Sequence, residues 1–416
     1  MSILNVNQIQ PVGSGQTITI SATNIDTGSA TVTAGTFSGG VTVTSGNLTG
    51  ITSVSTSNLT VNGNAYPSSG PLSNRNLIIN GAMQVAQRGT SDTGFSSSSY
   101  AADRFRINVS NMGTWNGSNS STAPDGFTNS CKFVCATADA SPASADFINF
   151  KQIFEGQDLH HLKYGTSSSE SLTLSFWVRS NKTGTYTVEL DRESTDFNSI
   201  SYTISSADTW EYKTVTFSGL TGSSIPNDNT EGLKINWWLA GGSNYSSGTQ
   251  INNTWHTTTA NRLASGQVNL ADAVSNEWYI TGVQLEVGTV ATPFEHRSYG
   301  DELARCQRYY YRAVLSASDI WGSGYNQNTT VTRNIIHFPV TMRTQPTAVE
   351  TTGTSGDYRV LHGTTVTACS AVPTFNSATT HNGEVQATVS SGLTAGQGNM
   401  LETNTNNAYL AWSAEL

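Results

Sequence analysis

Hydrophobic and polar residues alternate along several segments in the middle of the chain. Three segments show this most clearly: "LTLSFWVRS" from Leu172, "LKINWWLAGG" from Leu233 and "EWYITGVQLEV" from Glu277. A period of two indicates strands with one buried face. Because polar turns separate the segments, we predict a jelly-roll-like β-sandwich over residues 71–290. The residues expected to face its core are Leu172, Leu174, Phe176, Val178, Leu233, Ile235, Trp237, Leu239, Val283, Leu285 and Val287.

An eleven-residue repeat runs through the N-terminal part of the chain. The copies "TVTAGTFSG", "TVTSGNLTG" and "SVSTSNLTV" begin at Thr31, Thr42 and Ser53. Such a unit buries too little apolar surface to be stable alone, so we expect an intertwined β-repeat shaft over residues 21–70, formed by identical chains around a shared axis. A linker without regular structure is the alternative. The residues expected at the axis are Phe37, Leu48 and Leu59.

The segment after the predicted sandwich has a different pattern, which indicates a short connecting helix within residues 291–312. Acidic residues near its start and arginines near its end complement a helix dipole. Its hydrophobic residues are spaced as on one helical stripe, which we expect to face the axis of a trimer. Residues 313–416 return to strand patterning and predict a small β-rich C-terminal tip domain. The expected trimer-axis residues of the helix are Leu303, Cys306 and Tyr310.

Composition excludes several classes of protein. Only 12% of the residues are charged and the net charge is −9, without a run of lysine or arginine, so a nucleic-acid-binding surface is not expected. No stretch reaches the ~20 apolar residues of a membrane-spanning helix, so membrane insertion is not expected either. Four scattered cysteines do not make a disulfide framework. We predict no metal site and no cofactor, since the adjacent His160 and His161 and the pair Cys131 and Cys135 lack metal-ligand spacing.

Two tryptophans are candidates for contact with a glycan. Trp177 and Trp238 fall on the polar faces of their strands, beside Arg179 and Asn236. An aromatic ring next to hydrogen-bonding groups suits the apolar face and the hydroxyls of a sugar. The alternative is that a loop, the second sheet or a neighbouring subunit covers these rings.

Two other groups of residues have side chains that occur in catalytic sites, but neither group is expected to be catalytic. Glu189, Asp191 and Glu193 share a face of one strand, as in glycosidases, but they are predicted to lie at a solvated strand end where no carboxyl pKa would be raised. Cys306 and His296 lack both a motif and a shared element. We therefore expect no enzymatic activity.

Several long motifs resemble tail-fibre proteins of tailed bacteriophages, particularly those that infect marine cyanobacteria. They are "MSILNVNQIQPVGSG", "NRNLIINGAMQVAQRGTS", "KQIFEGQDLHHLKYGTSSSESLTLSFWVRSNKTGTYTVEL" and "ITGVQLEVGTVATPFEHRSYGDELARCQRYYYR". The resemblance implies a homotrimeric virion protein, assembled in the host cytoplasm, whose residues 1–20 attach to tail or adaptor proteins. Its distal domains would bind host surface polysaccharide or lipopolysaccharide.

The central domain also resembles jelly-roll carbohydrate-binding modules. Those modules often carry an acidic residue before the last strand for a structural calcium ion. Thr281 and Gly282 stand there in this chain, so the calcium is not carried over.

Three functions remain open on the sequence. The first is a non-enzymatic, receptor-binding tail fibre. The second is a tailspike that depolymerises polysaccharide, although the parallel β-helix repeat usual in such enzymes is not evident between residues 75 and 300. The third is a structural tail component in which Trp177 and Trp238 anchor other virion proteins.

Overall fold

A computed structural model describes residues 60–61, 64–65, 70 and 73–416 of the chain. The short strands β1 (Thr60–Val61) and β2 (Asn64–Ala65) pair with each other. The predicted attachment segment, the axis residues Phe37, Leu48 and Leu59, and all of the repeats except Thr60 and Val61 lie outside the described residues.

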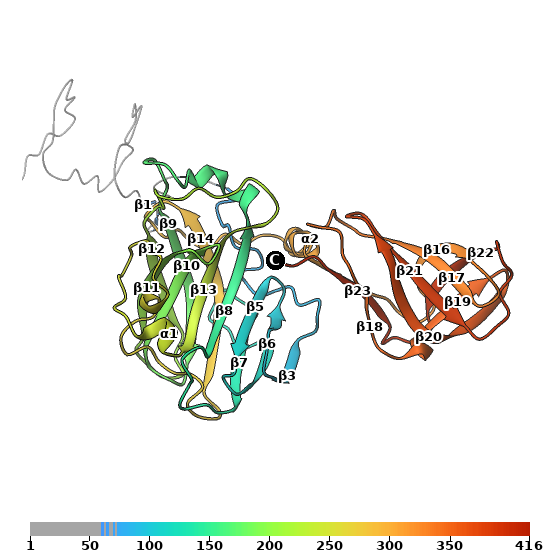
Figure 1. Cartoon of the computed structure of the whole chain (residues 1–416), viewed down its shortest axis with the longest axis horizontal. Coiled ribbons are helices and arrows are strands. Elements are labelled where there is room, and N and C mark those ends of the chain that lie inside the picture. Colours follow the sequence, from blue (N-terminus) through green and yellow to red (C-terminus); the bar gives the residue numbers. More distant parts are fainter. Residues whose placement is uncertain (1–59, 62–63, 66–69, 71–72) are drawn as a thin grey trace, which may run out of the picture. The chain divides into compact units, whose positions relative to one another are not determined.

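Two antiparallel six-stranded sheets form the central β-sandwich (Figure 1). Sheet I has the order β11-β10-β13-β8-β5-β4, and sheet II has the order β12-β9-β14-β7-β6-β3. The mainly β fold with a jelly-roll-like sandwich is confirmed. The strands of sheet I are β4 (Ser99–Ala102), β5 (Phe105–Ser110), β8 (Phe147–Glu155), β10 (Gly184–Arg192), β11 (Asp196–Ile204) and β13 (Glu231–Gly241). Those of sheet II are β3 (Ser91–Phe95), β6 (Thr114–Ser120), β7 (Ser130–Thr137), β9 (Leu172–Ser180), β12 (Glu211–Phe217) and β14 (Glu277–Val287).

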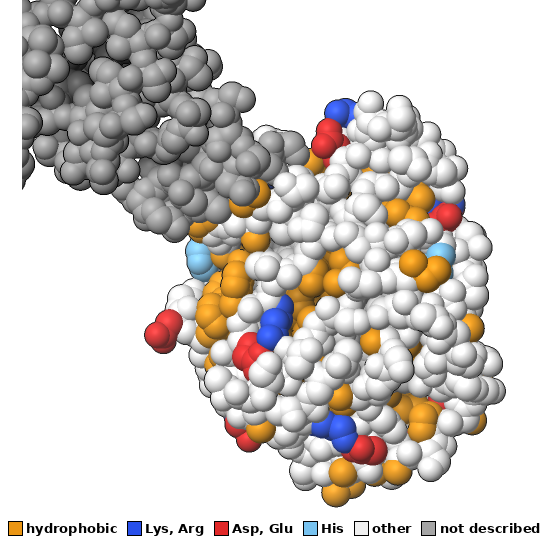
Figure 2. Space-filling view, turned by 90° about the vertical axis from the view of Figure 1, so that its left-hand side faces the viewer, with side chains coloured by type: hydrophobic (Ala, Val, Ile, Leu, Met, Phe, Trp, Pro, Cys, Tyr) orange, Lys and Arg blue, Asp and Glu red, His pale blue; other side chains and the backbone are white. Residues whose placement is uncertain are grey.

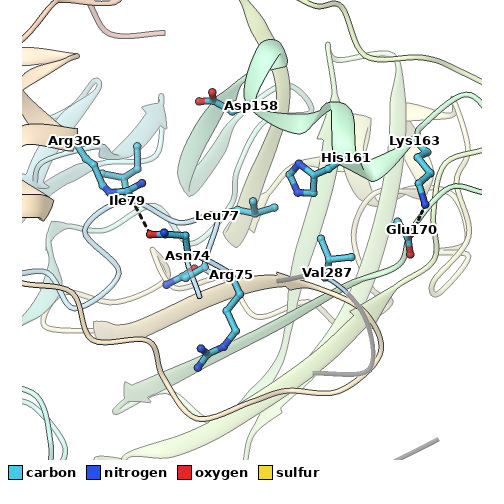
Figure 3. A pocket seen from close by; sticks show the side chains of 12 residues that line it. Asn74, Arg75, Leu77, Ile79, Asp158, His161, Lys163, Glu170, Val287 and Arg305 are labelled. Atoms are coloured by element: carbon cyan, nitrogen blue, oxygen red, sulfur yellow. Dashed lines mark hydrogen bonds and ion pairs between the residues drawn. The ribbon is translucent and has the colours of Figure 1, made fainter. Parts of the chain in front are cut away.

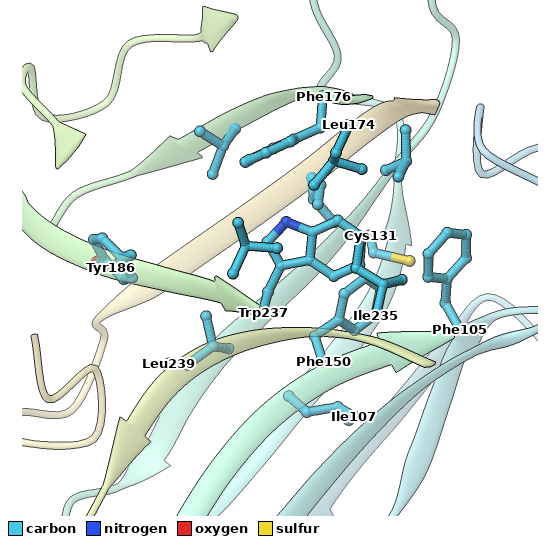
Figure 4. Close-up of a cluster of buried hydrophobic side chains, with 14 of the residues drawn as sticks. Phe105, Ile107, Cys131, Phe150, Leu174, Phe176, Tyr186, Ile235, Trp237 and Leu239 are labelled. Atoms are coloured by element: carbon cyan, nitrogen blue, oxygen red, sulfur yellow. The ribbon is translucent and has the colours of Figure 1, made fainter. Parts of the chain in front are cut away.

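The alternating hydrophobic residues of the three segments meet between the two sheets, as expected. All are buried in one continuous core. Trp237 lies near its centre, with ring centroids 5.9 Å from Phe150 and 5.8 Å from Phe176 (Figure 4). Because alternate residues of a strand point to opposite faces, the neighbours of these core residues form the outer faces of the sandwich.

The C-terminal part forms a closed six-stranded barrel of order β16-β17-β21-β20-β19-β22, with a separate three-stranded sheet, β15-β23-β18. Its hydrophobic core is distinct from that of the sandwich. The predicted β-rich character of this part is confirmed. Its strands are β15 (Tyr310–Val314), β16 (Ile320–Asn326), β17 (Val331–His337), β18 (Glu350–Thr351), β19 (Tyr358–His362), β20 (Thr365–Ala378), β21 (Asn382–Val389), β22 (Gly398–Thr403) and β23 (Tyr409–Ser413).

Helices are few and short. The predicted connecting helix is α2 (Tyr299–Gln307), and the Ser298 side chain caps it by accepting a hydrogen bond from the backbone N–H of Asp301. The other helical turns are η1 (Gly156–Leu162), α1 (Ser243–Ser246), η2 (Thr259–Asn261) and η3 (Ser355–Asp357).

The prediction that Cys306 and Tyr310 face a trimer axis is wrong. Cys306 is 0% exposed and Tyr310 is 1% exposed, because the chain itself covers both. The helix ends before Tyr310, which lies in β15 beneath the Arg88 guanidinium, 3.6 Å from its ring centroid. The placement of the partly buried Leu303 at such an axis stays a prediction.

Candidate functional site

The four predicted glycan-contact residues do not form one site. Trp177 and Arg179 lie on β9, on the outer face of sheet II. Asn236 and Trp238 lie on β13, on the outer face of sheet I. Since these outer faces point away from each other, each must be considered separately.

A long loop, residues 242–276, lies against the outer face of sheet I and covers Trp238. The Trp238 ring lies 5.2 Å from that of Tyr245 and 4.9 Å from the Arg262 guanidinium carbon. Only 1% of Trp238 is exposed. The prediction that this ring is a platform for a sugar is therefore wrong, and the alternative of a covering loop holds for it.

Arg179 is also occupied by contacts within the chain. It pairs with Asp208 at 3.0 Å and with Glu277 at 3.4 Å, and its guanidinium carbon lies 4.7 Å from the ring centroid of Tyr279. Trp177 differs, because its ring is partly exposed and lies 5.3 Å from that of Tyr212.

The predicted solvated strand end is wrong for two of its three carboxylates. Glu189 and Asp191 are each 0% exposed, and only Glu193, in the turn after β10, is exposed. Arg262 of the covering loop donates two hydrogen bonds to Glu189, at 2.9 and 2.5 Å, and one to Asp191 at 2.8 Å. A buried carboxylate pair needs such compensation, so Arg262 fixes the loop to the sheet.

A small cleft of about 140 Å³ remains between this loop and sheet I. It is lined mainly by polar and charged side chains of β5, β8, β10 and β13. Its lining residues are Asn108, Phe147, Asn149, Lys151, Asp191, Ser194, Lys234, Asn236, Trp238, Tyr245 and Arg262.

Two buried amide oxygens in this cleft lack a hydrogen-bond donor. The Asn236 Nδ2 group donates to Glu189 at 3.0 Å. Because only the nitrogen side of the amide can donate to a carboxylate, its Oδ1 atom must point the other way, and it has no partner among the described residues. The Oδ1 atom of Asn149 is likewise buried without a partner. Buried polar groups are normally satisfied, so a missing donor is informative.

Two cations lie beside these oxygens. Charged side chains are sparse on the face of the molecule that Figure 2 shows. Arg106 on β5 nevertheless lies directly opposite Lys151 on β8. No ion pair joins either of them to a residue in the described part of the chain. Burial, followed by the positive charges of Arg106 and Lys234, lowers the pKa of Lys151 to about 8. An anion at this position would offset the cost of holding these charges together.

The acidic groups of the cleft differ in their access to it. Burial, followed by the Glu189 carboxylate, raises the pKa of Asp191 to about 6, and Asp191 lines the cleft. Glu189 does not line it, and it accepts hydrogen bonds from Ser199, Asn236 and Trp238 as well as from Arg262. Thus Asp191 borders the cleft, where Lys234 also pairs with it at 3.4 Å, and Glu189 is sealed below it.

A cavity of about 640 Å³ lies at an end of the sandwich near η1 (Figure 3). Two of its charged residues, Lys163 and Glu170, already pair with each other at 2.7 Å, and Arg305 donates to Asn74 at 3.3 Å. His161 supplies an exposed ring, but its pKa is lowered by burial. The lining also includes Gly70, whose neighbours 66–69 and 71–72 lie outside the described residues.

Other candidate chemistry is not brought together by the fold. All four cysteines are buried and free, and burial, followed by the Asp103 carboxylate, raises the pKa of the Cys306 thiol well above its usual range. His160 and His161 are exposed on η1. Within the described ranges, no cluster of three potential metal ligands occurs, and no helix is long and apolar enough to span a membrane.

Comparison with known proteins gives similarity to solved structures alone. No family model matches the chain, and no curated protein matches it. About half of the chain, 51%, aligns with the enzymatically active domain of tailspike protein 4 from bacteriophage CBA120, at 12% identity and a TM-score of 0.27, over 21% of that protein's length. The same share aligns with all of a putative sugar-binding protein from Bacteroides thetaiotaomicron (11% identity, TM-score 0.29) and with 99% of the module TmCBM61 in complex with β-1,4-galactotriose (10% identity, TM-score 0.26). TM-scores this low establish no shared fold.

The residues that give the sheet I cleft its charge are not among those predicted from the sequence. Lys151 interrupts the apolar run "FINFKQIF", and a lone lysine in a buried strand is a usable signal. Arg262 stands in the loop segment "ANRLASG", where nothing in the sequence indicates that it reaches Glu189.

Proposed function

We propose that the chain is a non-enzymatic attachment protein that binds an acidic glycan in the cleft over sheet I. The observation that carries this proposal is the juxtaposition of Lys151, which forms no ion pair with a described residue, with the donor-free oxygens of Asn149 and Asn236. A carboxylate or sulfate group of a sugar would pair with the lysine. The hydroxyl groups of the same sugar would donate hydrogen bonds to the two amide oxygens.

The arrangement favours binding over catalysis. Inverting and retaining glycosidases both need two carboxyl groups that reach the scissile bond, and Glu189 is sealed beneath Arg262. A depolymerase is the second candidate, because the raised pKa of Asp191 in the cleft suits a general acid.

The tail-fibre role rests on the sequence motifs. In that role residues 1–20 would attach to the virion tail, and a homotrimer would present three glycan sites to a repetitive host polysaccharide or lipopolysaccharide. Repeated weak sites gain strength by avidity. Native mass measurement of the full chain tests the trimer, and a stable monomer would contradict it. If in addition no glycan binds, the alternative of a structural tail component gains support.

The binding proposal is tested by affinity electrophoresis of the full chain in gels that contain alginate, polygalacturonate or heparin, with dextran as the neutral control. We expect retardation by at least one acidic polymer. The variant Lys151→Ala should weaken that binding at least tenfold, whereas Lys182→Ala, which removes a lysine paired with Asp272 outside the cleft, should not. Equal retardation of all three proteins contradicts the proposed site, and no retardation of the wild type by any acidic polymer contradicts the proposed ligand.

The absence of enzymatic activity is tested on the same polymers. Incubation with the full chain should produce no new reducing ends. Product that forms with the wild type but not with Asp191→Asn would establish the depolymerase instead.

A further inference from the structure

An aromatic cleft lies on the outer face of sheet II, on the opposite side of the sandwich from the sheet I cleft. Its volume is about 360 Å³, within the usual range for small-ligand sites. Rings and small residues from five separate parts of the chain line it. They are Asp125, Gly126, Phe127, Ser175, Trp177, Tyr212, Gly282, Pro293, Phe294 and His296.

Two groups of rings form this cleft. Trp177 and Tyr212 are cross-strand partners on β9 and β12, with ring centroids 5.3 Å apart. The second group consists of Phe127, Phe294 and His296, in which the three centroid distances are 5.0, 5.5 and 4.8 Å. Tyr212 is 45% exposed, and His296 is also exposed. Large rings left open to solvent in a cleft indicate a binding surface more than a core.

Gly282 allows the two groups to meet. It lies at an irregularity in the pairing of β14 with β9 and has a φ of +61°. A Cβ atom there would lie 2.7 Å from the Phe127 ring and 3.0 Å from the Trp177 ring. Glycine at this position therefore allows Phe127 to approach Trp177 closely. A residue with a side chain at position 282 would prevent this approach.

The polar groups of the cleft select the class of ligand. The Asp125 carboxylate is exposed and forms no hydrogen bond or ion pair with a described residue. Burial raises the pKa of the Tyr212 hydroxyl, which therefore remains a neutral donor. The cleft lining includes no lysine or arginine. Such a site disfavours anions, and it fits a ligand with an apolar face and hydroxyl donors.

We propose that this cleft is a second glycan site, which binds one or two neutral pyranose units by stacking on Trp177 and Tyr212 and by hydroxyl donation to Asp125. It goes beyond the proposed function, since it needs no anionic group and shares no residue with the sheet I cleft. Each chain would then bind glycan on both outer faces of its sandwich and could engage an acidic and a neutral part of one polysaccharide.

The test is affinity electrophoresis of the full chain against neutral polymers: β-1,4-galactan, glucomannan, xyloglucan and dextran. We expect at least one of them to retard the wild type, and Trp177→Ala and Tyr212→Ala to weaken that binding ten- to a hundredfold. Trp210→Ala is the matched control, because Trp210 is a partly buried ring that packs on Tyr279, outside the cleft. Asp125→Ala removes an exposed side chain that folding does not need and should weaken binding three- to tenfold.

The outcomes separate the two sites. Lys151→Ala should leave binding of the neutral polymer unchanged, and Trp177→Ala should leave binding of acidic polymers unchanged. The second site is overturned if no neutral polymer retards the wild type, or if both Trp177→Ala and Asp125→Ala bind like the wild type.

Discussion

Arg106 and Lys151 lie directly opposite each other across the β5–β8 strand pair, and neither forms an ion pair with a described residue. Like charges in this arrangement destabilise a sheet, all the more where burial removes water. The stability lost to this cation pair accords with the binding surface that we propose.

Replacement of Lys151 by methionine should therefore stabilise the fold while it abolishes binding of acidic glycan. Methionine keeps the length of the side chain and removes the partly buried charge, so we expect a gain of about 1–3 kcal/mol in the free energy of unfolding, measured by urea denaturation. Lys182→Met is the control and should change stability by less than about 1 kcal/mol, because it breaks only a surface ion pair. A Lys151→Met protein that is less stable than the wild type would contradict the strain that we assign to this cation pair.

Binding of acidic glycan should weaken as the pH rises from 7 to 9.5. The pKa of Lys151 is lowered to about 8, so the charged ammonium group that attracts the anion is present below that pH and is lost above it. A bound anion favours the charged form, so in the complex the midpoint shifts above 8. Titration of affinity against pH measures this, and Lys151→Arg should remove the pH dependence because arginine stays charged. An affinity that does not change over this range would exclude Lys151 from the site.

Arg262 should be essential for the closed position of the loop over sheet I. Its replacement by methionine removes the ion-pair partner of the buried Glu189 and one of the two cations that pair with Asp191, which should cost about 3–5 kcal/mol of stability. Arg192→Met is the control, since Arg192 pairs with Glu193 and Asp196 near the surface, and it should cost under about 1 kcal/mol.

A double variant shows whether the charge is the cause. Glu189→Gln combined with Arg262→Met removes one of the uncompensated carboxylates and should recover part of the loss. If the double variant is as unstable as the sum of the two single variants, the coupling between Glu189 and Arg262 is absent.

The core-facing residues of the strands could be predicted from the sequence. Whether the outer face of each sheet is exposed or covered could not. Leu174 and Ile235 reveal their direction by alternation, because a core imposes a period of two. Trp177 and Trp238 follow the same pattern on the polar side, yet one is partly exposed and the other is covered by residues 242–276. Whether a loop returns over a sheet depends on tertiary contacts, which no local pattern encodes.

The candidate sites were predictable to the same limited extent. Trp177 can be predicted as a site residue because aromatic residues are unusual on the polar face of a strand. Phe127 and Phe294 cannot, because they join it from loops far away in the sequence. Cys306 was correctly placed on a hydrophobic stripe, but the partner of that stripe is this chain's own sandwich, whose buried Glu155 also holds Arg308 and Tyr309. A stripe predicts burial, not the identity of the covering surface.

Gly282→Ala should weaken ligand binding in the aromatic cleft without affecting the sheet I cleft. A methyl group at a φ of +61° is strained and would press against the Phe127 and Trp177 rings, so we expect a loss of about 1–3 kcal/mol in stability and at least a tenfold loss in binding of neutral glycan. The control is Gly300→Ala in helix α2, where nothing lies within 4 Å of the added methyl group and the change should be neutral or stabilising by about 0.5–1 kcal/mol. Urea denaturation and affinity electrophoresis measure the two effects. Gly282 contributes nothing to the sheet I cleft, so a parallel loss of acidic-glycan binding would mean that the substitution disturbs the whole sandwich. Unchanged binding of neutral glycan would mean that the approach of Phe127 to Trp177 is not needed for the site.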